Sequence, residues 1–131
     1  MIRMIESLVD FPTRFLPDED YIGKFEPGIA VQLVTKNGVP CVQPSDGTRP
    51  IGVVGDSVGK EIYDLVPVWL ETMIFRTDKI LNEKFPPGSK LYVSRGGLFT
   101  SVRPFEDALY VGHVISTIFD KGDKLIEVNW I

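Results

Sequence analysis

The chain contains very few of the side chains that form nucleophilic or metal-binding sites. Among its 131 residues there is one cysteine, Cys41, and one histidine, His113. A single cysteine permits no intrachain disulfide, and a zinc site built from cysteine and histidine ligands needs more of both. Cys41 lies between Pro40 and Val42, where a small core side chain is favoured over a nucleophile. His113 lies in an alternating strand pattern, so we expect both residues to be metal-free and non-catalytic.

Carboxylate and glycine-rich motifs are equally sparse. The run Asp18-Glu19-Asp20 could hold Ca²⁺ weakly, but it lacks the spacing of an EF-hand loop, and a solvated loop is favoured. The segment Gly55 to Lys60 is shorter than a phosphate-binding loop and lacks the serine or threonine that follows the lysine there. Spacing alone assigns no pair of carboxylates to acid–base catalysis. We therefore predict no bound metal, no cofactor and no enzymatic activity.

The charge balance argues against a dedicated nucleic-acid-binding protein. Lysine and arginine number 14 and aspartate and glutamate number 18, which gives a formal net charge of −4. Nucleic-acid binders usually present a basic face that neutralises phosphates. Five aromatic residues could stack on single-stranded bases, but the basic residues near them are few, so packing in the core or at a subunit interface is favoured. They are Trp69, Phe75, Tyr92, Phe99 and Trp130.

Size and hydropathy indicate one globular domain without a membrane segment. Hydrophobic residues make up 44% and charged residues 24% of the chain, close to the averages for globular domains. No apolar run approaches the roughly 20 residues of a membrane span, and residues 1–15 lack the continuous apolar stretch of a secretory signal. We therefore expect no membrane partner. The protein is expected to stay in a reducing cytoplasm or to leave the cell inside a larger assembly.

The elements that must carry any function are predicted to be β-strands. Alanine, the best helix former, occurs only twice, whereas the 12 glycines and 10 prolines punctuate short apolar runs. Turns at Asn37-Gly38, Gly96-Gly97 and Lys121-Gly122 indicate three hairpins, and Pro40 indicates a sheet edge. We predict an all-β fold, a single compact β-barrel or β-sandwich of about eight strands. The expected strands are 29–35, 39–43, 51–54, 66–77, 90–94, 98–102, 110–119 and 125–131.

An internal repeat relates the two halves of this barrel. Residues 27–44 and 87–104 both open with Pro-Gly, continue with an alternating strand, turn at a glycine and end in Val-x-Pro. This match needs one gap and one insertion. The next strands, 51–54 and 111–114, also match, at a spacing of 60 residues. We predict a duplication with repeat units of about 27–60 and 87–118, which share one core.

Residues 1–26 stand outside the repeat and are expected to form an extended N-terminal arm, with the barrel domain in residues 27–131. Pro12 and Pro17 prevent a long helix here. An apolar segment of this kind must pack either on its own barrel or on a neighbouring subunit, and both alternatives stay open. The candidate interface residues are Phe11, Phe15, Leu16, Tyr21, Phe25, Trp69 and Phe75.

The run of residues 27–118 resembles the small β-rich decoration, or cement, proteins of tailed-phage capsids. The resemblance is a pattern of glycines, apolar strands and turns. It is carried by Pro27-Gly28, Pro50-Ile51-Gly52-Val53, Val68-Trp69, Phe75-Arg76-Thr77-Asp78, Gly88, Leu91-Tyr92-Val93-Ser94 and Gly112. It implies a structural role in the virion without catalysis. Such proteins bind the outer capsid surface as oligomers, often trimers, at junctions between capsomers.

We therefore expect a protein made in the host cytoplasm that binds the major capsid protein and itself, with a trimer favoured over a dimer, on the outer surface of the virion. Two other classes stay open: a tail or connector component, and a small cellular barrel that binds a ligand or nucleic acid. If the arm is an interface, deleting residues 1–20 should weaken capsid binding and leave the β-type circular dichroism intact. Unfolding of the truncated chain would place the arm in its own core.

Overall fold

The computed structural model describes residues 1–56 and 65–131, and these residues confirm the predicted all-β class. The described residues contain eleven strands and one short 3₁₀ turn, η1. Their bounds are β1 (Ile2–Ser7), β2 (Thr13–Pro17), β3 (Ala30–Lys36), β4 (Val39–Pro44), β5 (Gly52–Val54), β6 (Val66–Leu70), β7 (Met73–Thr77), β8 (Lys90–Val93), η1 (Arg95–Gly97), β9 (Phe99–Thr100), β10 (Gly112–Asp120) and β11 (Asp123–Trp130).

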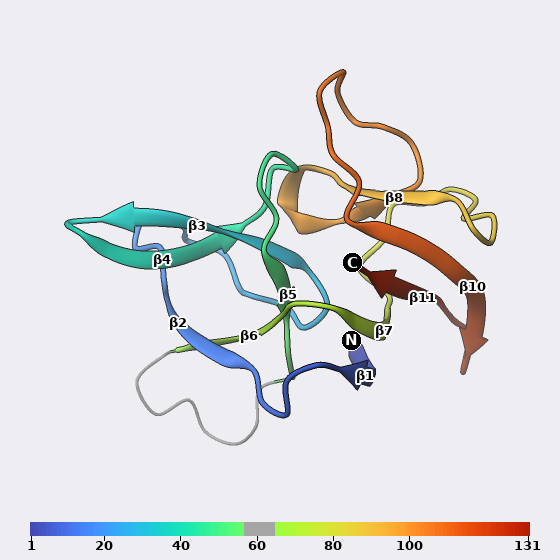
Figure 1. Cartoon of the computed structure of the whole chain (residues 1–131), viewed down its shortest axis with the longest axis horizontal. Helices are drawn as coiled ribbons and strands as arrows, with labels where there is room; N and C mark the ends of the chain where they lie inside the picture. The colour runs from blue at the N-terminus through green and yellow to red at the C-terminus, as the bar shows by residue number, and fades with distance from the viewer. Residues whose placement is uncertain (57–64) are drawn as a thin grey trace.

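The strands form two sheets that lie side by side (Figure 1). One is a closed barrel in the order β2-β4-β3-β5-β6, and the other is a six-stranded sheet in the order β1-β7-β11-β10-β8-β9. The strand count exceeds the expected eight for two reasons. Residues 1–26 supply β1 and β2, and the single strand expected at 66–77 is two strands, β6 and β7. Glu71 has a φ of +69°, which breaks the extended chain so that β6 joins the barrel and β7 joins the sheet.

Three predicted local features are present. Asn37-Gly38 (φ 52° and 78°) and Lys121-Gly122 (φ 52° and 86°) join β3 to β4 and β10 to β11. Two consecutive positive φ values give the turn whose twist matches that of the flanking strands. Pro40 lies opposite Thr35 of β3, beyond the two residue pairs that join β4 to β2. This position suits a residue that has no N–H to donate to a neighbouring strand.

The predicted duplication is present in the strand pairing, at the predicted spacing of 60 residues. The pairing of β5 with β3 and β6 recurs in the pairing of β10 with β8 and β11. The backbone N–H of Gly28 donates to Val54 O at 2.8 Å, and that of Gly88 donates to Val114 O at 2.7 Å. The matched residue pairs are Val31–Gly52 and Leu91–Gly112, Gly52–Leu70 and Gly112–Trp130, and Val54–Val68 and Val114–Val128.

The duplicated unit is larger than the sequence comparison indicated. The antiparallel pairing of β2 with β6 has its counterpart in β7 with β11, and the parallel contact of β2 with β4 has its counterpart in an isolated bridge between Ile80 and Phe99. The first unit is therefore β2 to β6, the closed barrel, and the second unit is β7 to β11. Strand β1 is an addition to the edge of the second unit.

The two units share apolar contacts but differ where they meet. The outer face of the barrel contributes Ala30 and Val53 to the larger core cluster, which is built mainly from the second unit. In addition, the N–H of Gly97 in η1 donates to Ser45 O of the barrel at 2.9 Å. Three residues on this face of the barrel have counterparts 60 positions later, on the equivalent face of the second unit, and these counterparts are polar. The three corresponding pairs are Ala30 and Lys90, Val53 and His113, and Trp69 and Asn129.

Candidate interaction surfaces

Residues 1–26 supply strands to both sheets and do not form a separate arm. Strand β1 pairs antiparallel with β7, and β2 pairs with β6 on one side and with β4 on the other. Ile2 is buried in the larger core. Of the two alternatives for this segment, the structure shows packing on its own sheets, because these strands complete the hydrogen bonding of β6 and β7.

Two of the expected interface residues lie in the core or against it. Phe75 is fully buried, with its ring centre 5.9 Å from that of Phe99. It therefore offers no surface to a partner in this fold, and the prediction that Phe75 is an interface residue is wrong. Trp69 is half-buried and packs against the larger core cluster. The sequence favoured packing of the aromatic residues in the core or at a subunit interface, and the structure places Tyr92, Phe99 and Trp130 in the core.

Three more of these residues line or cover one end of the barrel. Phe15 and Phe25 are half-buried and pack against the core cluster inside the barrel. Tyr21 is half-buried and meets Phe25 edge to face at 5.0 Å between ring centres. Its hydroxyl donates to Lys24 O at 3.0 Å. These contacts stabilise the chain between β2 and β3 against the barrel, although Ile22 in the same segment is 98% exposed.

Only Phe11 and Leu16 of the predicted set are largely exposed, at 79% and 45% of their surface. Phe11 lies between β1 and β2 in a connection that we call the corner, residues 8–12. Leu8, which the sequence analysis did not single out, is 71% exposed in the same connection. The Leu8 N–H donates to Thr72 O at 3.2 Å, which holds the corner against the junction between the two units.

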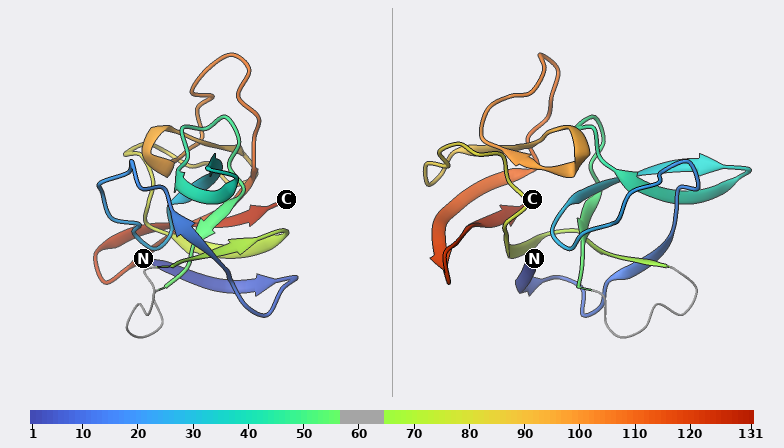
Figure 2. Two further views of the ribbon diagram at one scale, coloured as in Figure 1. Left: turned by 90° about the vertical axis from the view of Figure 1, so that its left-hand side faces the viewer. Right: turned by 180° about the vertical axis from the view of Figure 1, so that it is seen from behind.

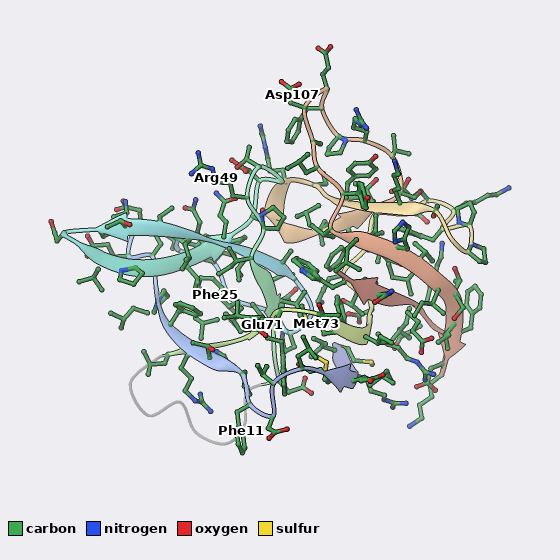
Figure 3. All side chains as sticks on the ribbon, in the orientation of Figure 1. Phe11, Phe25, Arg49, Glu71, Met73 and Asp107 are labelled. Atoms are coloured by element: carbon green, nitrogen blue, oxygen red, sulfur yellow. The ribbon has the colours of Figure 1, made fainter. Side chains whose placement is uncertain are left out.

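A second exposed apolar group lies in the connection between β9 and β10, which we call the long loop, residues 101–111. Val102 is 63% and Leu109 is 74% exposed, and Phe105 and Tyr110 are also exposed. In Figure 3, Phe11 of the corner lies at the bottom of the molecule and Asp107 of the long loop lies at the top. Sequence reasoning missed this group.

The barrel has a hollow of about 600 Å³ at one mouth, next to the chain that follows β2. Apolar groups line it, and so does Asp18, which is buried. The Asp18 carboxylate accepts the Asp20 N–H at 3.1 Å and lies 3.6 Å from Lys36 Nζ. Lining residues include Pro17, Tyr21, Phe25, Val66 and Pro67.

The acidic run Asp18-Glu19-Asp20 is only partly solvated. Glu19 and Asp20 are exposed, but Asp18 is buried, so the expectation of a solvated loop is wrong for Asp18. Lys36 lies beside both aspartates, and its hydrogen bond to Asp20 raises the pKa of the Lys36 ammonium. A cation supplied by the chain itself therefore faces these carboxylates and balances the local charge.

The glycine-rich segment that the sequence analysis compared with a phosphate-binding loop falls largely outside the described residues. Of Gly55 to Lys60, the structure describes Gly55 and Asp56. Gly55 continues the barrel beyond β5, where its N–H donates to Pro67 O at 2.9 Å. This backbone bond is a structural contact within the barrel.

Two other charged groups, Asp46 and Arg76, have structural partners. The Asp46 carboxylate, in the turn after β4, accepts the Thr48 hydroxyl at 2.6 Å and the Thr48 N–H at 2.9 Å. These hydrogen bonds favour the ionised form and lower the pKa of Asp46. Arg76 pairs with Glu127 across β7 and β11 at 3.1 Å. Such contacts fix turns and strand pairs.

The remaining candidates for chemistry are dispersed in the described residues. Cys41 is buried on β4, with Sγ 3.7 Å from Val39 O, and His113 on β10 lies near Tyr110, at 5.5 Å between ring centres. Within residues 1–56 and 65–131, no three histidine, cysteine or carboxylate side chains come together in a way that could hold a metal ion. Helices long and apolar enough to cross a membrane are absent from the same residues.

Comparison of the chain with protein-family models finds no matching family, and comparison with curated proteins finds no matching relative. The exposed surfaces of the molecule are consequently the basis for a functional proposal.

Proposed function

We propose that this protein is a non-enzymatic structural component of a phage virion that binds the outer surface of the capsid and stabilises it. The observation that carries the proposal is the pair of exposed apolar patches at opposite ends of the molecule, the corner and the long loop (Figure 3). Apolar side chains of this size exposed in groups mark surfaces that bind other proteins. Two such surfaces suit a protein that joins one neighbour to another.

The sheet edges favour contacts through side chains over strand addition. Among the described residues, β1 pairs only with β7, and its register is interrupted between Met4 and Glu6. At the opposite edge, β9 has only two residues. Irregular or very short edge strands resist pairing with another chain. A partner is therefore expected to contact the loops at the two ends of the molecule.

The resemblance to capsid decoration proteins gives independent support. The residues that carry it are the corners and strands of the duplicated units. Gly28 and Gly88 precede the first strand of the repeated pattern in each unit, and Gly52 and Gly112 begin the central strands. A rigid body built this way presents its loops at low entropic cost. Weak contacts repeated within an oligomer on a shell add through effective concentration, and binding to the assembled shell stabilises it by mass action.

Co-sedimentation with empty capsid shells of the phage that encodes the chain tests the proposal. We expect the protein to pellet with the shells at a saturable number of copies per shell, and light scattering to show a trimer or a dimer in free solution. Bovine serum albumin at the same concentration serves as the control for trapping in the pellet. A monomer that stays in the supernatant at every concentration would contradict the proposal.

A second candidate, a ligand-binding barrel, is favoured by the hollow alone. A volume of about 600 Å³ is within the range of small-molecule sites, which are mostly apolar with a few polar groups. Tyr21 and Phe25 would supply apolar contacts there, and Asp18 would supply the polar group, although Lys36 already neutralises it. A monomer that ignores shells in the sedimentation experiment would favour this candidate.

A further inference from the structure

The long loop is longer than the corresponding connection of the first unit. In the first unit, residues 45–51 join β4 to β5; in the second, residues 101–111 join β9 to β10. The shorter connection lies against the body, with Ser45 buried and its carbonyl oxygen bonded to Gly97. The long loop, drawn in orange, stands out from the body in all three views of Figures 1 and 2. Strand β9 has two residues and its counterpart β4 has six, so the second unit leaves a longer stretch of chain outside its strands at this point.

The long loop is held in one shape although it projects. Arg103 Nη1 donates to Glu106 O at 3.1 Å, and the Ala108 N–H donates to Phe105 O at 3.1 Å. Ala108 is buried beneath the loop. At its base, the Tyr110 ring lies 4.9 Å from Lys90 Nζ. A loop fixed in this way loses little conformational entropy on binding, so its exposed apolar side chains are available for a partner.

The charges at the loop tip limit what that partner is. Glu106 and Asp107 are both exposed, and neither forms an ion pair with another described residue. The loop also contains one cation, Arg103, which is bonded to the Glu106 carbonyl oxygen, so its net charge is −1. A twofold contact between two copies through this loop would bring the acidic tips together, which is unfavourable. Anionic phosphates of nucleic acid or lipid would be repelled for the same reason. The complementary surface is apolar in the middle, for Val102 and Leu109, and basic at its rim.

We propose that the long loop is the capsid-contacting element, and that it seats Val102 and Leu109 in an apolar cleft bordered by lysine or arginine on the outer face of the major capsid protein. This inference rests on the proposed function and names the surface that performs it.

The test compares shell binding by three purified proteins: the wild type, the double variant Val102→Ser/Leu109→Ser, and the control Phe119→Ser. Phe119 is 75% exposed, as apolar as the loop residues, and lies far along β10 from Gly112, at roughly 23 Å for strand spacing. We expect the loop variant to raise the Kd for shells about 30-fold or more, as loss of a central apolar contact does. The control should stay within about twofold of the wild type.

The charge reversal Glu106→Lys/Asp107→Lys tests the contribution of the basic rim to binding separately from that of the apolar cleft. The wild-type Kd should rise with salt concentration, and the reversed variant should bind more weakly at low salt, because electrostatic complementarity is lost. Circular dichroism and a thermal melt of each variant check that the fold is retained, which is expected because all the substituted side chains are exposed.

Each outcome decides between specific alternatives. If the wild type binds shells and the loop variant binds equally well, the capsid-contacting surface lies elsewhere, and only this inference is overturned. If the loop variant keeps shell binding but changes the mass measured by light scattering, the loop contacts a second copy, and the inference is again overturned. If the wild type itself does not bind shells, the proposed function fails and the inference fails with it.

Discussion

Deleting residues 1–20 is expected to unfold the chain, not merely to weaken its binding to a capsid. The deletion removes β1 and β2 together. The barrel then loses the strand that joins β4 to β6, and β7 loses one of its two partner strands and keeps the other, β11. Val42 and Val66, buried inside the barrel, would become accessible to water. The loss is comparable to the whole stability of a domain, about 5–15 kcal/mol. Far-ultraviolet circular dichroism and thermal melting would measure it.

A deletion in the long loop provides the matched control for this experiment. Removing residues 104–107 gives the β9–β10 connection the same number of residues as its counterpart in the first unit, seven residues at 45–51. The shortened protein should keep its strand signal and a cooperative melt. If the 1–20 deletion instead kept the wild-type spectrum and melting temperature, β1 and β2 would not be integral to the fold, and the expectation of a separate arm would be restored.

Substituting Gly112 by alanine is expected to cost about 3 kcal/mol or more of unfolding free energy, near the upper end for overpacking. Gly112 begins β10 opposite Trp130, and a Cβ there would overlap the backbone carbonyl of Asn129. Backbone atoms of a paired strand have little freedom to move away. The duplication predicts the same result for Gly52, where a Cβ would overlap the carbonyl oxygen of Trp69. Urea denaturation of each variant measures the change.

Gly122→Ala separates this overlap from the general effect of adding a methyl group. Gly122 has a φ of +86° in the β10–β11 turn, but no atom lies within 4 Å of the position that its Cβ would take. The substitution should therefore cost only the left-handed backbone strain, about 1–2 kcal/mol. Equal losses for Gly112→Ala and Gly122→Ala would show that the close approach of β10 to β11 does not determine the stability.

Short-range features of the fold could be predicted from the sequence because they depend on neighbouring residues. The turns at Asn37-Gly38 and Lys121-Gly122 follow from local φ preferences, and the alternation of apolar residues places most strands within one or two positions. The spacing of 60 residues identified the duplication because each unit needs glycine at the same close contact. Gly52 and Gly112 show this requirement in the structure.

The pairing of strands that lie far apart along the chain could not be predicted from the sequence. β1 and β2 are short, and their strand character depends on β7, β6 and β4, which lie far along the chain. Apolar alternation at residues 66–77 gave no sign that Glu71 turns the chain from one sheet to the other. The pattern also could not separate core from interface. Phe75 and Phe11 are both phenylalanines in apolar surroundings, yet one is fully buried and the other is largely exposed.

The aligned repeats nevertheless contained a signal for how the units meet. At the face where the barrel packs on the second unit, Ala30 and Val53 are apolar, whereas their counterparts Lys90 and His113 are polar. Polar residues on the outward face of a terminal repeat prevent further stacking. Comparing the repeats position by position would thus have predicted that only the first unit is covered on this face.

The most direct test of the capsid-cementing role is the temperature at which empty shells disassemble, measured by light scattering with and without the protein. If the protein cements the shell, this temperature is expected to rise with protein concentration and to level off at the number of copies that saturates the shell, because a ligand that binds the assembled shell and not its dissociated subunits stabilises the shell. A disassembly temperature that stays unchanged at saturating concentration, with the protein demonstrably bound, would contradict the cementing role.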